Sequence, residues 1–147
     1  QPSVDRDRIH VVGASYGGYM ASLLSTKRPI ASLVLRAPAL YPDEKFRTPT
    51  LHIVGSDIQI YRQQHLTYQK NKALSAIHAY GGKILLIECE NDDDVPKPTT
   101  NNFARVIRDQ KQLTRIVIPG ADHTLSQPQW KQFFIDTSAS WFSKKDH

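Results

Sequence analysis

A serine, an aspartate and a histidine occur in this chain in an order and spacing that could support nucleophilic catalysis. Ser15 stands in the stretch Gly-Ala-Ser-Tyr-Gly-Gly at residues 13–18, Asp92 follows an apolar run, and His123 follows a later one. A serine hydroxyl is a poor nucleophile unless a histidine takes its proton and a carboxylate orients that histidine. Each residue is expected in a turn at the carboxyl end of a strand, where α/β sheets gather their sites. We therefore predict a catalytic triad of Ser15, Asp92 and His123.

The turn around Ser15 has the pattern G-x-S-x-G between a strand-like run and helix-forming residues, which is typical of a nucleophile elbow. Gly13 and Gly17 are expected to avoid clashes where strand and helix approach each other. The Tyr16 amide would donate to the developing oxyanion, aided by the positive end of the helix. The alternative is an ordinary glycine-rich turn with a solvated serine.

The histidine is chosen from six. Only His123 lies in a loop after a strand at the right place in the order, whereas the others lie in expected strands or helices or at the end of the sequence: His10, His52, His65, His78 and His147. His123 could still be a loop histidine without a role.

The acid is less sharply defined, because Glu90, Asp92, Asp93 and Asp94 share one turn. Asp57 is a second candidate, since it also follows a strand-like run. We favour Asp92 because only one helix and one strand separate it from His123. An acidic loop that binds a cation is the other interpretation of this turn. We expect no metal and no organic cofactor.

The elements that would position these residues alternate between strands and helices. Such alternation predicts an α/β fold with three layers, in which helices cover both faces of a mostly parallel sheet. The expected strands are 8–12, 30–36, 50–54, 83–89 and 114–118, and the expected helices are 16–27, 62–79, one that begins near residues 99–101 and one from 128.

Composition is that of a globular protein, with 39% hydrophobic and 22% charged residues among 147. No apolar run reaches the roughly 18 residues of a membrane span, and the first residues do not resemble a signal peptide. A single cysteine suits a reducing compartment, so we expect a cytoplasmic protein. The net charge of +5 comes from scattered Lys and Arg residues, which favours a solvated basic surface over a nucleic-acid site.

These motifs together resemble the α/β-hydrolases. Residues 12–20 resemble the elbow of prolyl-oligopeptidase-like serine hydrolases and of dienelactone-hydrolase-like esterases. Residues 92–96 (Asp-Asp-Asp-Val-Pro) resemble the acid turn of that group, whose first aspartate is the triad acid. Residues 120–123 resemble its histidine loop, and residues 35–40 fit the segment after the strand that follows the elbow.

The resemblance has two departures. Cys89 stands where the group usually has glycine, and we interpret this cysteine as a small buried residue. Members of the group also carry several strands and helices before the elbow, including a loop that supplies a second oxyanion donor. We therefore expect one domain over 1–147 that is the C-terminal half of such a fold, with a complementary N-terminal half or a second copy as partner. Without the second donor, the isolated chain is expected to be a weak catalyst.

The resemblance implies acyl transfer to water through an acyl-enzyme. We expect a carboxylic ester as the small-molecule substrate, because nothing in the sequence builds a peptide-selecting domain. An oligopeptidase-type serine peptidase and a non-catalytic module are the alternatives. Residues 41–69 fall between elbow and acid, where they could form a cap over the site. No nucleic acid or membrane is expected as a partner.

Overall fold

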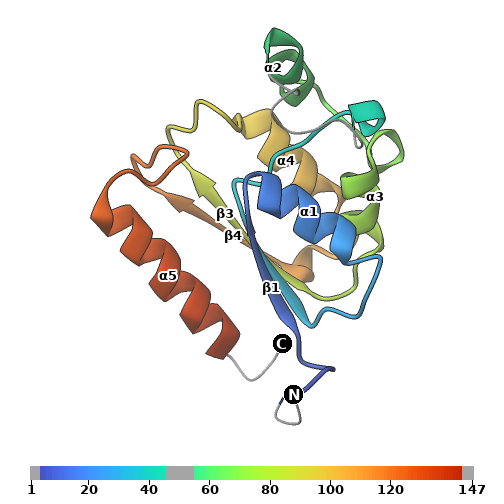
Figure 1. Cartoon of the computed structure of the whole chain (residues 1–147), viewed down its shortest axis with the longest axis vertical. Coiled ribbons are helices and arrows are strands. Elements are labelled where there is room, and N and C mark those ends of the chain that lie inside the picture. Colours follow the sequence, from blue (N-terminus) through green and yellow to red (C-terminus); the bar gives the residue numbers. More distant parts are fainter. Residues whose placement is uncertain (1–3, 46–54, 144–147) are drawn as a thin grey trace.

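The computed structural model describes residues 4–45 and 55–143, and it contains a four-stranded parallel sheet (Figure 1). The strands lie side by side in chain order: β1 (His10–Ala14), β2 (Ser32–Arg36), β3 (Lys83–Cys89) and β4 (Leu113–Ile118). Every neighbouring pair is parallel, with Val12 beside Val34 and Val34 beside Leu85. The predicted α/β fold with a parallel sheet is confirmed.

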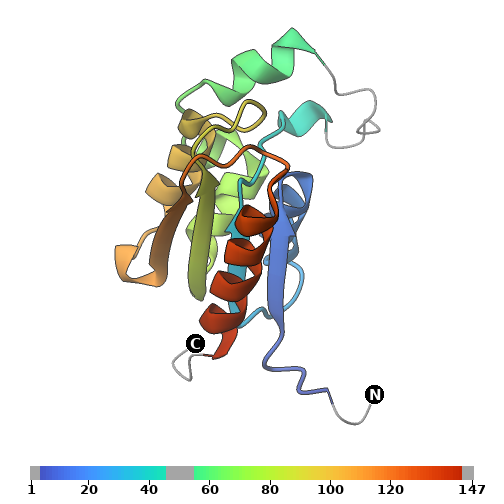
Figure 2. The same cartoon turned by 90° about the vertical axis from the view of Figure 1, so that its left-hand side faces the viewer.

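Helices cover both faces of this sheet, which gives the three expected layers (Figure 2). One layer holds the helices that follow the first three strands, and the other holds the last helix. The first layer consists of α1 (Tyr16–Leu24), α3 (Lys72–Ala79) and α4 (Lys97–Val106), and the second of α5 (Pro128–Ser143).

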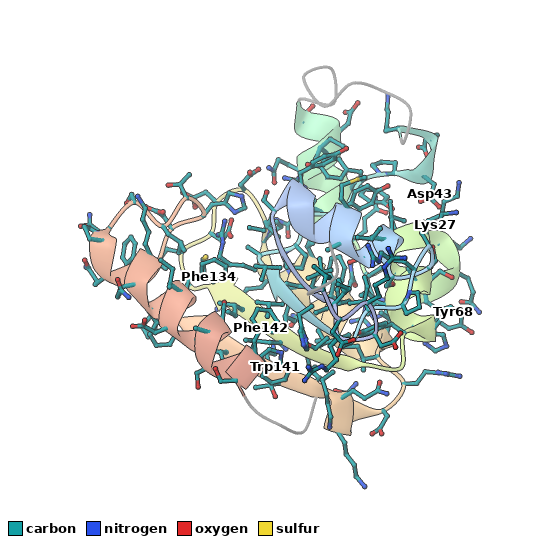
Figure 3. All side chains as sticks on the ribbon, turned by 60° about the horizontal axis from the view of Figure 1, so that its bottom comes forward. Lys27, Asp43, Tyr68, Phe134, Trp141 and Phe142 are labelled. Atoms are coloured by element: carbon teal, nitrogen blue, oxygen red, sulfur yellow. The ribbon has the colours of Figure 1, made fainter. Side chains whose placement is uncertain are left out.

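Helix α5 packs on the sheet through one aromatic stripe. Trp141 is buried, and Phe134 and Phe142 are partly buried against the core (Figure 3). The helical spacing of Trp130, Phe133, Phe134, Thr137 and Trp141 favours one such stripe, although Phe133 is 41% exposed. The two central strands form the middle of the core, since Leu33, Val34 and Leu86 are fully buried. Parallel strands covered on both faces require such continuous apolar runs.

The expectation of one long helix over residues 62–79 is wrong. The chain forms the short helix α2 (Ser56–Arg62), a 3-10 turn η3 (Tyr68–Lys70) and then α3. Asn71 divides them, because it has extended backbone angles and its side chain accepts hydrogen bonds from the amides of Ala73 and Leu74. An asparagine that satisfies the first free amides starts a helix, so the periodicity of 62–79 spanned two elements.

Other boundaries move by a few residues. Helix α1 ends at Leu24, before the expected end at residue 27, and α4 begins at Lys97, before the start expected near residues 99–101. Thr100 lies inside α4 and donates to Glu88 at 2.5 Å. The strand expected over 50–54 lies outside the described residues. The described residues also include the 3-10 turns η1 (Asp43–Lys45) and η4 (Gln110–Gln112). Within the described ranges, none of the helices has the length and apolar character needed to cross a bilayer.

Candidate active site

Ser15 stands alone between β1 and α1 in a strained conformation. Its φ is 53° and its ψ is −118°, a region that side-chain-bearing residues rarely adopt. Backbone hydrogen bonds hold this geometry: the Ser15 amide donates to Arg36 at 2.9 Å, and its carbonyl accepts from Gly18 and Ala39 at 3.0 Å each. The strand-to-helix turn predicted from the sequence is therefore present.

The glycines around Ser15 differ in whether a side chain at their position would clash. A Cβ on Gly13 would lie 2.4 Å from the Gly17 carbonyl oxygen, and one on Gly18 would lie 2.7 Å from Cβ of Pro38. Gly17 itself has open space where a Cβ would be, so the expectation that it avoids a clash is wrong here. The close approach is between the backbones at Gly13 and Gly17, and of these two residues only Gly13 needs to lack a side chain.

Asp92 lies in the turn after β3, with a side chain only 4% exposed. Its Oδ1 accepts hydrogen bonds from the amides of Asp94 at 3.0 Å and Val95 at 2.7 Å. The other oxygen, Oδ2, remains for His123. The turn thus fixes the orientation of the carboxylate through its own backbone.

His123 follows β4 in a loop that is held at both ends. Asp122 accepts hydrogen bonds from the Ser126 amide at 3.0 Å and from the Ser126 hydroxyl, and these bonds lower the pKa of its carboxyl. Leu125 has a φ of 53°, so the loop, like the elbow, stores backbone strain beside the site.

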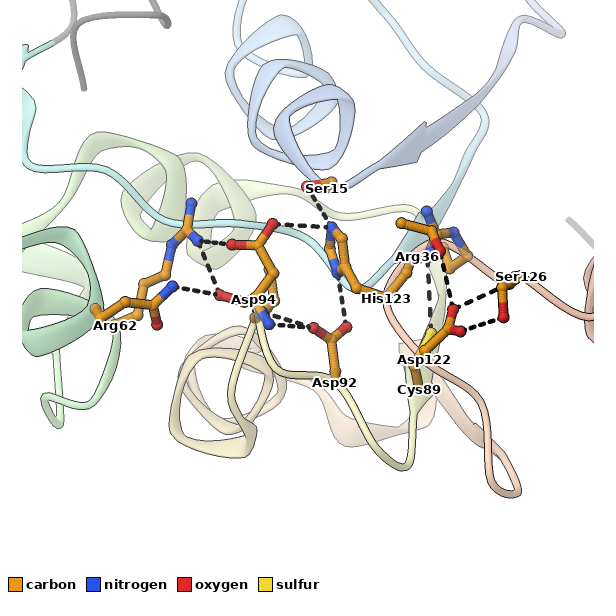
Figure 4. Close-up of polar contacts among 12 residues, drawn as sticks. Ser15, Arg36, Arg62, Cys89, Asp92, Asp94, Asp122, His123 and Ser126 are labelled. Atoms are coloured by element: carbon orange, nitrogen blue, oxygen red, sulfur yellow. Dashed lines mark hydrogen bonds and ion pairs between the residues drawn. The ribbon is translucent and has the colours of Figure 1, made fainter. Parts of the chain in front are cut away.

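The three predicted residues come together in one chain of hydrogen-bonding contacts (Figure 4). His123 Nδ1 lies 2.8 Å from Asp92 Oδ2, and His123 Nε2 lies 2.9 Å from Ser15 Oγ. The imidazole is 15% exposed, so it is accessible on one side. This arrangement lets a base take the serine proton while the carboxylate holds the ring.

A second carboxylate, not assigned a role from the sequence, reaches the same nitrogen. Asp94 Oδ2 lies 3.4 Å from His123 Nε2. Its Oδ1 pairs at 2.8 Å with Arg62 of α2, whose side chain is 5% exposed. Arg62 also stacks over the Tyr41 ring at 5.1 Å. Asp94 could have been placed at the site from its closeness to Asp92 in the sequence, whereas no feature of the sequence indicated that Arg62 would lie there.

Arg36 is a second buried cation that sequence reasoning missed. It ends β2, and its Nη1 donates to the His123 carbonyl at 2.7 Å and contacts Cys89 Sγ at 3.6 Å. The guanidinium lies 5.8 Å from the centre of the Phe134 ring. Burial raises the pKa of the Cys89 thiol, in spite of the opposing effect of Arg36, which agrees with a buried structural cysteine.

The other sequence candidates lie away from this chain of contacts. Glu90 accepts a hydrogen bond from the Gly120 amide at 2.7 Å, and Asp57 lies in the first turn of α2. His10 contacts Ser32 Oγ at 2.7 Å, and His78 stacks on Tyr68. His52 and His147 lie outside the described residues. Among residues 4–45 and 55–143, no group of three or more metal-ligating side chains is found.

The expected oxyanion donor is positioned at the first residue of α1. The Tyr16 amide donates to no acceptor in the described parts of the chain, as is usual for the first amides of a helix. The Tyr16 ring is 41% exposed and packs edge-on against Tyr41, with 5.6 Å between ring centres. The first amide of α1, adjacent to Ser15 in the sequence, is thus unpaired within the described residues.

This chain resembles known proteins in sequence and in fold. The sequence model of the prolyl oligopeptidase family matches residues 1–146. The chain belongs to this family. It is a family of serine hydrolases and peptidases with the α/β-hydrolase fold, so the resemblance seen in the motifs is confirmed at that level. The chain matches no curated protein sequence at a significant level.

Solved structures of this family's fold include larger proteins. The acylaminoacyl peptidase of Pyrococcus horikoshii superposes with a TM-score of 0.71 at 18% identity, over 99% of this chain and 25% of that one. An esterase domain from Rhodothermus marinus gives 0.64 at 14% identity, over 90% and 58%. A putative dienelactone hydrolase from Klebsiella pneumoniae gives 0.67 at 15% identity, over 95% and 53%. The chain therefore spans between about a quarter and three fifths of these proteins, and the likeness concerns the fold.

Proposed function

We propose that this chain carries the catalytic triad of a serine hydrolase that cleaves carboxylic esters. The observation that carries the proposal is the continuous contact from Ser15 Oγ through the His123 ring to Asp92. Family membership supports the same reaction class, since the family consists of serine hydrolases.

In the proposed mechanism, Ser15 Oγ attacks the acyl carbonyl carbon while His123 Nε2 takes the hydroxyl proton. Asp92 holds the proton-bearing Nδ1 and stabilises the imidazolium that forms. The Tyr16 amide donates to the oxygen that becomes negative. His123 then gives the proton to the departing alcohol, which leaves an acyl-enzyme on Ser15. A water molecule, deprotonated by the same histidine, releases the acid and restores the serine.

The test is the reaction of the chain, and of any longer protein that contains it, with a fluorophosphonate probe. We expect one covalent adduct, mapped by mass spectrometry to Ser15, and none on Ser15→Ala. Ser22→Ala is the matched control, because Ser22 is a buried serine of α1 whose hydroxyl donates to the Gly18 carbonyl. A folded protein that gives no adduct would support the alternative of a non-catalytic module.

A peptidase of the oligopeptidase type is the second candidate, and the family match is the observation that favours it. The same residues would act on an amide in place of an ester. Turnover of an ester and of an amide with one shared acyl group separates the two: a detectable rate on the ester alone supports the esterase.

We also propose that residues 41–45 and 55–69, the described parts of the segment 41–69, lie against the site as a cap. The support comes from α2, where Arg62 donates to the carbonyl and the carboxylate of Asp94 at 2.8 Å each. Replacing Arg62 by methionine should therefore change the preference among esters of different acyl length. An unchanged preference would argue against a cap.

A further inference from the structure

Two buried polar side chains of α4 bind the backbone of residues 62–66, a stretch that begins at the last residue of α2. Thr99 is 0% exposed and donates its hydroxyl to the Arg62 carbonyl at 2.8 Å. Asn102 is 1% exposed, and its side-chain nitrogen donates to the Gln64 carbonyl at 2.8 Å. Residues three positions apart share one face of a helix. That face of α4 therefore holds the chain where it leaves α2.

Asn102 makes a second contact with the same stretch. Its side-chain oxygen accepts a hydrogen bond from the Leu66 amide at 3.1 Å while its nitrogen binds the Gln64 carbonyl. One side-chain amide thus pairs with a donor and an acceptor of the backbone, as a neighbouring strand would. Arg105 Nη2 donates to the same oxygen at 2.5 Å and to the Leu66 carbonyl at 3.2 Å. Connected hydrogen bonds in a buried setting are rigid, so residues 62–66 are fixed relative to α4.

Arg62 connects this anchored stretch to the acid turn (Figure 4). Its Nη1 donates to the carbonyl and to the carboxylate of Asp94 at 2.8 Å each, and its Nε donates to the Leu40 carbonyl at 3.4 Å. The Asp94 amide in turn donates to Asp92 Oδ1 at 3.0 Å, and the other oxygen of Asp92 faces His123. A continuous series of contacts therefore runs from α4 to the acid of the proposed triad.

Helix α2 depends on these polar contacts because it has few apolar ones. Of its seven residues, only Ile58 and Arg62 are buried. A short helix with so little buried surface is weakly held unless other contacts fix it. The bonds from Thr99 and Asn102 fix the backbone from which the Arg62 side chain extends. They thereby reduce the conformational freedom that this long side chain must lose when it binds the acid turn.

We propose that Thr99 and Asn102 are positioning residues of the proposed hydrolase, which act through Arg62 on the orientation of Asp92. The inference rests on the proposed function and extends its site to a face of α4. The two side chains hold the end of α2, Arg62 holds the acid turn, and the turn presents the carboxylate to the histidine.

The test measures the rate at which the fluorophosphonate probe labels Ser15, at a temperature where circular dichroism shows that every variant is folded. Thr99→Val keeps the shape and removes the hydroxyl, and we expect labelling to be about tenfold slower, since small displacements of catalytic groups are costly. Thr99→Ser keeps the donor and should retain most of the rate. Asn102→Ala should be slowed as much as Thr99→Val. Asn101→Ala is the matched control, because Asn101 is exposed, contacts Arg115 of β4 at 2.5 Å and should not affect the rate.

A double-mutant cycle distinguishes positioning from a general loss of stability. Arg62→Met removes the connection to the acid turn, so Thr99→Val should have no further effect on the labelling rate in that background. Its effect on the free energy of unfolding should persist there, because the hydroxyl binds the backbone carbonyl of residue 62. A residue with a merely structural role would slow labelling by the same factor in both backgrounds.

Two different results would overturn the inference. If Ser15 is labelled in the wild type and neither Thr99→Val nor Asn102→Ala slows the reaction, or Thr99→Val slows it equally with and without Arg62, the positioning role fails and the hydrolase proposal stands. If the folded wild-type protein gives no adduct on Ser15, the proposed function itself fails and the inference fails with it.

Discussion

Strands β1 and β3 each lead into a turn that carries a residue of the proposed triad, yet they lie in very different surroundings. In β3 every residue from Ile84 to Cys89 is buried, with neighbouring strands on both sides. Strand β1 lies at the edge of the four-stranded sheet, and its Val12 is 47% exposed. The turn after β3 is thus supported by a packed core, whereas the turn after β1 is held by backbone hydrogen bonds.

This difference shows what each part of the site depends on. The elbow keeps its shape through the bonds of Ser15 to Arg36, Gly18 and Ala39. The acid turn depends on a strand inside the core, because Asp92 lies in the turn that follows β3. A disturbance of the core should therefore affect the acid more than the nucleophile, and a change in the elbow should act locally.

The largest expected effect is a contrast in stability between the two strands. Leu86→Ala, at a position 1% exposed in β3, should lower the free energy of unfolding by about 2–5 kcal/mol. Val12→Ala in β1 should cost less than about 1 kcal/mol, because half of that side chain is already in solvent. Urea denaturation measures both. Equal losses would mean that β1 is as well packed as β3 in solution.

The next contrast lies inside the elbow. Gly13→Ala should cost about 1–3 kcal/mol and slow the probe reaction at Ser15, since the new Cβ meets the Gly17 carbonyl oxygen at 2.4 Å. Gly17→Ala is its control: it has open space and lies in α1, so it should be neutral or gain up to about 1 kcal/mol. A destabilised Gly17→Ala would show that something covers this face.

A smaller effect should appear where β2 supports the histidine loop. Arg36→Met removes the charged donor to the His123 carbonyl, and we expect the probe to react with Ser15 about tenfold more slowly. As a positioning residue, Arg36 should affect kcat and leave KM nearly unchanged. Arg36→Lys keeps a donor and should restore part of the rate. Equal rates in all three proteins would remove Arg36 from the site.

The smallest expected effect is on the pH dependence of stability, and it comes from the contact between Glu88 of β3 and Arg115 of β4. Burial alone would raise the pKa of Glu88, but hydrogen bonds from Arg115 and Thr100 outweigh it and hold that pKa below its ordinary value of 4.5. A lowered carboxyl pKa in the folded state contributes stability above the unfolded pKa, and this is lost as pH falls through the folded one. Below pH 4.5, the melting temperature should therefore fall less steeply with decreasing pH in Glu88→Gln than in the wild type. Parallel curves would contradict this.

Much of the fold and site could be predicted from short stretches of sequence. Continuous apolar runs identify strands that are buried on both faces, as at residues 83–89, because no other environment accepts them. The order of Ser15, Asp92 and His123 predicted which side chains meet, since parallel strands bring their carboxyl ends to one edge. The break at Asn71 was missed because one capping side chain outweighs a weak periodicity.

The sequence by itself determined the α/β architecture, the strained turn at Ser15 and the three residues that come into contact. Each depends on local pattern or on chain order, which a sequence displays directly. Only the tertiary structure decided that Gly17 is free of contacts, that Arg36 and Arg62 reach the His123 loop and the acid turn, and that Asp94 faces the reacting nitrogen. These features join segments as far apart as residues 36 and 123, and long flexible side chains find such partners only after the backbone has folded.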